Sequence, residues 1–152
     1  MAPICQGPPS TTTAASTTET TTDTAECPDG WATYTGAGSV TKCFKYFSDE
    51  QYATNAEESC RALGGHLASI HSIEEHNFIV QMVSADDFWV GGVDFNHNGA
   101  WGWTDGSNFD FSYWAPTQPD GGEYYLIIAG PLLDWRDWDN EHYRTYICQL
   151  IM

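Results

Sequence analysis

Residues 48–65 read Ser-Asp-Glu-Gln-Tyr-Ala-Thr-Asn-Ala-Glu-Glu-Ser-Cys-Arg-Ala-Leu-Gly-Gly. Ser48 and Gln51 have the spacing of a capping box, which predicts a helix over residues 52–63. The Gly64-Gly65 pair ends this helix. Four of its side chains fall on one face, at i, i+3, i+7 and i+10; they are Ala53, Ala56, Cys60 and Leu63. The pattern predicts an amphipathic helix that carries a cysteine on its buried face.

The five cysteines favour a disulfide framework over a metal site. They form no Cys-x-x-Cys pair, and no histidine spacing suits zinc. The sequence does not determine the connectivity, but a local bridge from Cys27 to Cys43 and a long one from Cys60 to Cys148 would leave only Cys5 over. The long bridge would contribute about 4 to 5 kcal/mol in the chain-entropy model. Because disulfides form in oxidising compartments, we expect a secreted or extracellular protein.

The rest of the chain has the pattern of an α+β domain. Residues 31–34 and 42–47 suit a hairpin, and a Ser72-x-x-Glu75 box predicts a second helix over residues 76–83. Further strands are expected at residues 88–92, 101–106, 126–128 and 143–150. Helices and strands that are segregated in this way indicate a largely antiparallel sheet. The stretch from Gly106 to Glu123 has no strong periodicity, and such long loops are usually functional.

The N-terminal segment differs in composition from this domain. Residues 10–25 are dominated by threonine and contain almost nothing that could be buried. We therefore predict a disordered stalk over residues 1–26 and one folded domain over residues 27–150. The stalk could carry O-glycans or be a plain linker. Cys5 lies in it and could link two chains into a disulfide-bonded oligomer.

The net charge of the chain limits the binding partners that can be expected. With 5 Lys+Arg against 21 Asp+Glu, the formal net charge is -16. Such a chain repels polyanions, so nucleic acid and anionic membrane surfaces are not expected as partners. No apolar run is long enough to insert into a membrane. The acidity serves solubility, or part of it is neutralised by bound cations.

Residues 114–120 read Trp-Ala-Pro-Thr-Gln-Pro-Asp and offer a candidate cation site. Gln118 and Asp120 place an amide and a carboxylate on either side of Pro119. Oxygen ligands suit Ca²⁺, and a proline held in the cis form would bring both side-chain oxygens to one point. Taken alone, the tripeptide is more often a simple turn. A second Ca²⁺ near Asp94 is conceivable, but that segment too is more often a turn.

The segment from Cys27 to Cys148 resembles the C-type lectin-like domain. The matching features are Cys27-Pro-Asp-Gly-Trp31, Ala56-x-x-x-Cys60, Gly64-Gly65-His66-Leu67-Ala68-Ser69-Ile70, Trp89-Val90-Gly91-Gly92, Trp101-x-Trp103-x-Asp105-Gly106, Trp114, the Gln-Pro-Asp loop and Tyr146-Ile147-Cys148. They follow the family's order over essentially the whole domain. The resemblance implies a C-type lectin-like fold with two helices, antiparallel sheets and a long loop region that binds Ca²⁺.

In that family the proline loop forms a Ca²⁺ site to which a sugar binds through two neighbouring hydroxyls, and a Gln-Pro-Asp loop resembles those of galactose binders. The carboxylate accepts a hydrogen bond and the amide donates one, so their order sets the pattern presented to the hydroxyls. Carried over by residue, Gln118, Asp120 and Glu123 are expected to bind both Ca²⁺ and sugar. The implied function is Ca²⁺-dependent binding of galactose-containing glycans.

The chain departs from the family where further ligands are expected. The usual Trp-Asn-Asp triplet corresponds to Trp135-Arg136-Asp137, which keeps Asp137 as a metal and sugar ligand but replaces the asparagine by Arg136. The other frame, Trp138-Asp139-Asn140, makes Asp139 the reserve ligand. A lost neutral oxygen and an added cation should weaken Ca²⁺ binding. If Arg136 points into the site, it would compete with the ion.

Two other departures concern the loops. The inner disulfide of the family is absent, since Tyr124-Tyr125 stands at one half and Asn140 or Tyr143 at the other. The Gln118 to Glu123 loop is short and lacks the aromatic residue that many galactose binders use. Trp138 could supply that aromatic face, or it could be a partly exposed strand residue.

An enzymatic function is not predicted. Acidic residues alternate in the short segment from Asp134 to Glu141, a pattern that is more often a set of ligands or a solvated face than a glycosidase pair. None of the five histidines falls in a recognisable triad context, and no cysteine is left as a nucleophile. The main alternative to sugar binding is the same fold without a metal, acting in protein–protein recognition.

Overall fold

The computed structural model describes residues 26–36, 40–84 and 87–152. The predicted stalk, apart from its last residue, and Cys5 lie outside the described residues. In the described part of the chain, no helix combines the length and apolar character needed to cross a bilayer.

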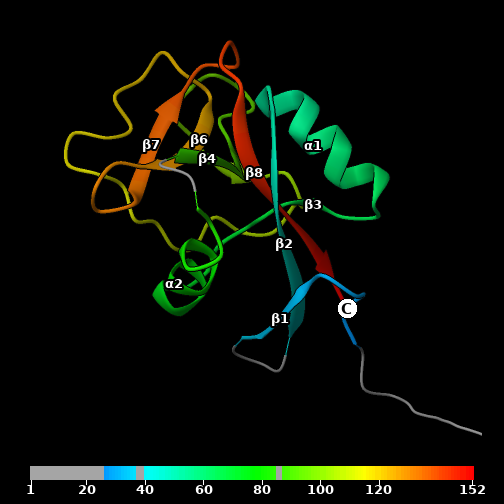
Figure 1. The fold of residues 1–152 in the computed structure, drawn as a ribbon. Helices are drawn as coiled ribbons and strands as arrows, with labels where there is room; N and C mark the ends of the chain where they lie inside the picture. Colours follow the sequence, from blue (N-terminus) through cyan, green and yellow to red (C-terminus); the bar gives the residue numbers. More distant parts are fainter. Residues whose placement is uncertain (1–25, 37–39, 85–86) are drawn as a thin grey trace, which may run out of the picture.

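Two helices and an eight-stranded sheet make up the described fold (Figure 1). The elements are β1 (Ala32–Thr35), β2 (Thr41–Gln51), α1 (Ala53–Ala62), β3 (His66–Leu67), α2 (Ile73–Val80), β4 (Asp87–Val93), β5 (Gly102–Trp103), β6 (Tyr125–Ala129), β7 (Asp134–Trp138) and β8 (Arg144–Ile151). The main strand order is β1-β2-β8-β4-β6-β7, and β3 pairs with β8 while β5 pairs with β4. Among the strand pairs of the described residues, β4–β8 is parallel and the others are antiparallel. The α+β class and the largely antiparallel sheet are confirmed.

Helix α1 matches its predicted extent but not its predicted cap. Ser48 and Gln51 belong to β2, and the N-cap residue is Tyr52, whose side chain makes no capping hydrogen bond. The predicted capping box is therefore wrong, because sheet pairing with β8 claims residues that were assigned to the cap. Ala53, Ala56 and Cys60 are buried as expected, but Leu63 lies beyond the helix and is 49% exposed.

Helix α2 begins three residues earlier than predicted. Ser72 is its N-cap, and its Oγ accepts a hydrogen bond from the Glu75 N–H at 3.1 Å. The Glu75 carboxylate does not complete a capping box. It accepts from the His71 N–H at 2.8 Å and pairs with Lys42 at 2.9 Å. Only one of the two hydrogen bonds of this capping box is therefore formed, because the Glu75 carboxylate pairs with the buried Lys42.

Two apolar clusters cover the two faces of the sheet. Alternation along β6 places Leu126 and Ile128 in one cluster, with Trp135, and places Ile127 in the other, with Trp89 and α1. The predicted strand over residues 101–106 is limited to β5, whereas β7, between Leu133 and Asp139, was expected only by resemblance. Strand β7 is the element that carries Asp137 to the functional region.

Two disulfides tie the first part of the domain to its end. Cys27 bonds Cys43, and Cys60 on α1 bonds Cys148 on β8 across 88 residues of sequence. These are the two bridges that were considered from the sequence, and Cys5 belongs to neither of them. Both bridges lie away from the long segment that connects β5 to β6, so that segment depends on other contacts for its shape.

Candidate metal and sugar site

Aromatic packing holds the long segment between β5 and β6 in place. The Trp135 side chain is fully buried, and the rings of Phe109, Phe111 and Trp114 meet it at centroid distances of 5.7 to 6.0 Å. Backbone hydrogen bonds from the Ala115 N–H to the Trp135 carbonyl and from the Trp135 N–H to the Tyr113 carbonyl, both 2.9 Å, join the segment to β7. These contacts bring residues 118–123 beside Asp137.

Three carboxylates meet at this point. Oxygens of Asp120, Glu123 and Asp137 all lie within 4.8 Å of one another. Asp137 is 2% exposed, and its two oxygens accept hydrogen bonds from the backbone N–H groups of Asp120 (3.2 Å) and Gly121 (3.1 Å). Those bonds orient the carboxylate and leave lone pairs on both of its oxygens.

Gln118 completes the group that the sequence analysis proposed. The Gln118–Pro119 peptide bond is cis. The side-chain oxygen of Gln118 accepts from the Asp137 N–H at 3.2 Å, and its amide nitrogen lies 3.5 Å from Oδ2 of Asp120. The structure thus brings together all four residues that were predicted as Ca²⁺ ligands.

The site has the electrostatics of a cation site. Burial and the nearby carboxylates of Asp137 and Asp120 raise the pKa of Glu123 above its ordinary value. Burial likewise raises the pKa of Asp137, and the Asp120 carboxylate adds to this effect while the Asp120 and Gly121 N–H groups oppose it. Carboxylate and amide oxygens are the ligands that Ca²⁺ prefers, and a divalent ion would relieve the repulsion between them. The donor set therefore fits Ca²⁺.

Arg136 does not point toward this group. Successive side chains of a strand face opposite sides, so Arg136 and Asp137 are on opposite sides of β7. The Arg136 guanidinium pairs with Asp134 at 3.1 Å. It packs over Gly130, where an added Cβ would lie 2.9 Å from its Nη2. The sequence alone could not show which way this arginine would turn.

Asp139 lies outside the cluster. Its Oδ1 accepts from the Glu141 N–H at 2.9 Å and lies 2.8 Å from Nδ1 of His142. These bonds lower the pKa of Asp139, with the Glu141 N–H as the first cause. Of the two frames that the sequence left open, the geometry favours the one that uses Asp137.

Trp138 lies on the side of β7 that faces away from Asp137. It packs with the cluster that contains Trp89, and the Arg144 guanidinium lies 5.0 Å from its ring centroid. Its Nε1 lies 3.3 Å from Nδ1 of His142. This placement agrees with the partly exposed strand tryptophan, and a sugar contact for Trp138 stays a prediction.

Asn140, one of the two positions considered for the inner disulfide, is hydrogen-bonded to the start of α1. Its Oδ1 accepts from the Thr54 N–H at 3.1 Å, and its Nδ2 donates to the Thr54 hydroxyl at 3.0 Å. The loop after β7 is thereby tied to the first turn of α1. Tyr143, the other position considered, stacks on Tyr52 at a centroid distance of 4.3 Å.

A cavity of about 440 Å³ extends from the carboxylates toward the loop after β4. Its walls include Glu123 and Asp137 together with three aromatic residues, His97, Trp101 and Tyr124. The sequence around His97 indicates only a turn or a second Ca²⁺ site. The buried Asp94 carboxylate accepts the N–H groups of Asn98 (3.1 Å) and Gly99 (2.7 Å), which makes this segment a turn.

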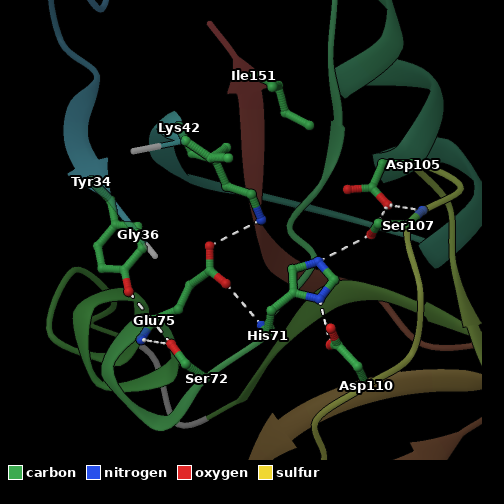
Figure 2. A pocket seen from close by; sticks show the side chains of 11 residues that line it. Tyr34, Gly36, Lys42, His71, Ser72, Glu75, Asp105, Ser107, Asp110 and Ile151 are labelled. Atoms are coloured by element: carbon green, nitrogen blue, oxygen red, sulfur yellow. Dashed lines mark hydrogen bonds and ion pairs between the residues drawn. The ribbon is translucent and has the colours of Figure 1, made fainter. Parts of the chain in front are cut away.

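A second cavity, of about 430 Å³, lies between α2, the β1–β2 hairpin and the segment after β5 (Figure 2). Figure 2 shows His71 between Ser107 and Asp110. Ser107 Oγ lies 3.1 Å from His71 Nε2, and His71 Nδ1 lies 2.7 Å from Asp110 Oδ1. Sequence analysis placed no histidine in a triad, because these three residues are brought together only by the fold.

This arrangement does not make Ser107 an activated nucleophile. The same Oγ lies 2.5 Å from Oδ1 of Asp105, and a hydroxyl has one proton to donate. Nucleophilic catalysis needs that proton to pass to the histidine, whereas Asp105 competes for it at the shorter distance. The hydrogen bonds brace the segment after β5. The absence of enzymatic activity stays a prediction.

Comparison with known proteins identifies the fold family. A family model described as "Lectin C-type domain" matches residues 49–150. The chain is 43% identical over 94 residues to the type-2 ice-structuring protein of Hemitripterus americanus, which covers 62% of this chain and 54% of that protein. It is 38% identical over 102 residues to the galactose-specific lectin nattectin of Thalassophryne nattereri, covering 64% and 61%.

A solved structure supports the same assignment. The crystal structure of a calcium-independent type II antifreeze protein superposes with a TM-score of 0.76 at 33% identity, covering 83% of this chain and 95% of that chain. The chain spans less than two thirds of the length of the two curated relatives. With its α+β fold, two disulfides and long loop region, the chain belongs to the C-type lectin domain family.

Proposed function

We propose that this protein binds galactose-type sugars in a Ca²⁺-dependent manner. Gln118, Asp120, Glu123 and Asp137 would hold the ion and contact two neighbouring hydroxyls of the sugar. The observation that carries the proposal is the cluster of three carboxylates within 4.8 Å, which has no basic side chain among its partners in the described residues. Bound Ca²⁺ would supply positive charge and open coordination positions for hydroxyl oxygens.

The order of the amide and the carboxylate supports the sugar type. Gln118 offers a donor and Asp120 an acceptor, and this order resembles the galactose binders of the family. Similarity to the galactose-specific lectin nattectin favours the same choice. We further propose that the protein is extracellular, with residues 1–26 as a stalk and Cys5 as a link between chains.

Two alternatives use the same fold without Ca²⁺. One is protein–protein recognition through the loops. The other is binding to ice, which is favoured by 43% identity to an ice-structuring protein and by the likeness to a calcium-independent antifreeze protein. The carboxylate cluster argues for the metal-dependent function, because three acidic groups held together without a cation repel one another.

The test is retention of the oxidised protein on immobilised galactose and mannose, with Ca²⁺ and then with chelator. Retention on galactose that chelator releases is the expected result. The variant Glu123→Gln should abolish retention, whereas Glu58→Gln, an exposed change on α1, should not. The paired change Gln118→Glu with Asp120→Asn should shift retention toward mannose. No retention of the unaltered protein on galactose would refute the proposal, and thermal hysteresis of its solutions would then favour ice binding.

A further inference from the structure

We propose that the stacked side chains of His97 and Tyr124 form the aromatic wall against which the apolar face of the bound sugar packs. This inference rests on the proposed function and adds a subsite to it. A pyranose has a polar edge of hydroxyls and a face of C–H groups. Sites for such ligands combine a few fixed polar groups with aromatic walls. The carboxylate cluster provides the polar groups but no aromatic surface of its own.

The wall and two of the three carboxylates, those of Glu123 and Asp137, line one cavity. Its volume of about 440 Å³ lies in the range of small-ligand sites, about 300 to 1,000 Å³. Glu123 and Asp137 line it on one side, and His97 and Tyr124 line it as well. Tyr124 directly follows Glu123 in the chain, so a sugar whose hydroxyls reach the Glu123 carboxylate would extend along the neighbouring aromatic ring.

The stack is held in position by the loop after β4. The His97 and Tyr124 rings lie 3.6 Å apart between centroids, at an interplanar angle of 8°. The Asp94 N–H donates to the Tyr124 carbonyl at 2.9 Å, and the Asp94 carboxylate fixes the turn that follows. His97 has a φ of 55°, a left-handed conformation that is uncommon for residues other than glycine, although His, Asn and Asp adopt it more often than the rest. The loop thus holds His97 in an uncommon backbone conformation and places the exposed His97 ring against the ring of Tyr124.

Other aromatic residues near the site have different partners. Trp138 is on the opposite side of β7 from Asp137 and packs in the cluster under α1. Trp101 lines the cavity, but it packs edge-on against Trp114 at 5.1 Å and is part of the core that holds the long segment. His97 and Tyr124 are the pair whose rings line the cavity outside that core.

The experiment compares ring removal with matched changes in the full chain. His97→Asn removes the ring and keeps a residue that tolerates positive φ. Tyr124→Leu removes the second ring, and Tyr124→Phe restores it without the hydroxyl. Tyr143→Leu is the control, because Tyr143 is an exposed, stacked aromatic residue that does not line the cavity. Trp138→Leu tests whether Trp138 provides the aromatic surface for the sugar instead.

Calorimetric titration with methyl β-galactoside in excess Ca²⁺ measures the sugar affinity, and a separate titration measures Ca²⁺ affinity. His97→Asn and Tyr124→Leu should each weaken galactoside binding about two- to tenfold with Ca²⁺ affinity unchanged. Tyr124→Phe and Tyr143→Leu should bind as the unaltered protein does.

Two outcomes would overturn the subsite alone: galactoside affinity that His97→Asn and Tyr124→Leu both retain, or a loss confined to Trp138→Leu. Failure of the unaltered protein to bind galactoside would overturn the proposed function together with the subsite.

Discussion

Two groups of acidic residues in the described part of the chain differ in the partners of their carboxylates: Glu75, Asp105 and Asp110 form the first cluster, and Asp120, Glu123 and Asp137 form the second. In the cavity of Figure 2, Glu75 pairs with Lys42 at 2.9 Å and Asp110 pairs with His71 at 2.7 Å. In the loop region, Asp120, Glu123 and Asp137 face one another. The Glu75 carboxylate thus has a cationic partner within the chain, whereas the three loop carboxylates are the groups for which we propose an external ion.

The carboxyl pKa values of the two clusters also shift in opposite directions. Burial opposes ionisation of Asp105 in the first cluster, but hydrogen bonds from Ser107 and Ser69 outweigh it and hold its pKa below the ordinary value. In the second cluster, burial and neighbouring carboxylates raise the pKa of Glu123. Folding thus favours the ionised form of Asp105 and disfavours that of Glu123, and the proposed Ca²⁺ would offset the second effect.

The largest expected effect comes from removing the internal cation of the first cluster. Lys42→Met leaves the buried Glu75 carboxylate without its partner, and we expect a loss of about 3 to 5 kcal/mol in the free energy of unfolding. Urea unfolding measures it. Lys45→Met on the same strand, which removes only a contact with Phe47, should cost about 1 kcal/mol or less. Equal losses in the two variants would contradict the distinction.

The second prediction concerns the cluster that depends on an external ion. Ca²⁺ at one hundred times its dissociation constant should stabilise the protein by about 2.7 kcal/mol. Glu123→Gln should remove most of this increment and leave the Ca²⁺-free protein as stable as before, or slightly more stable, because one like charge is gone. Thermal unfolding with Ca²⁺ and with chelator measures both. A Ca²⁺ increment that survives in Glu123→Gln would show that the ion binds elsewhere.

The third prediction uses pH to examine Asp105. Because its pKa is lowered by folding, its carboxylate stabilises the protein above the unfolded-state pKa of about 3.9, and this contribution is lost as pH falls through the folded-state pKa. Asp105→Asn should therefore cost about 1 to 3 kcal/mol at neutral pH. The difference from the unaltered protein should shrink below about pH 4. Urea unfolding across this range tests it, and a difference that stays constant with pH would refute it.

The smallest expected effect is that of Arg136 on the metal site. Its guanidinium pairs with Asp134 on the other side of β7, so Arg136→Met should change Ca²⁺ affinity by less than about threefold. Calorimetric titration with Ca²⁺ measures the change. A tenfold or larger gain in affinity would mean that the arginine does compete with the ion.

Local sequence signals predicted the parts of the fold in which neighbouring residues decide the conformation. The hairpin, the buried face of α1 through Cys60 and the end of α1 shortly before Gly64 follow from nearby residues. The Ser48 box was wrong for the opposite reason, since pairing of Gln51 with Arg144 on the distant strand β8 outweighs a local cap. The short β3 was missed because two residues carry no usable periodicity.

The candidate site was predictable as a set of residues and not as an arrangement. Gln118 and Asp120 flank one proline in the sequence, and resemblance added Glu123 and Asp137. The directions of Arg136 and Trp138 were not predictable, because they depend on which face of β7 meets which cluster. The stack of His97 on Tyr124 joins two loops that are distant in sequence, and no local signal marks it.

The amino-acid sequence by itself determined the family, the α+β class, the residues of the proline loop and the acidity of the chain. These properties rest on residue identity and short-range spacing. Only the tertiary structure decided which carboxylates find partners within the chain and which are left facing one another. The reason is that charge pairing acts through space: Lys42 meets Glu75, and Asp137 meets Asp120, only after the sheet and the long loop have formed.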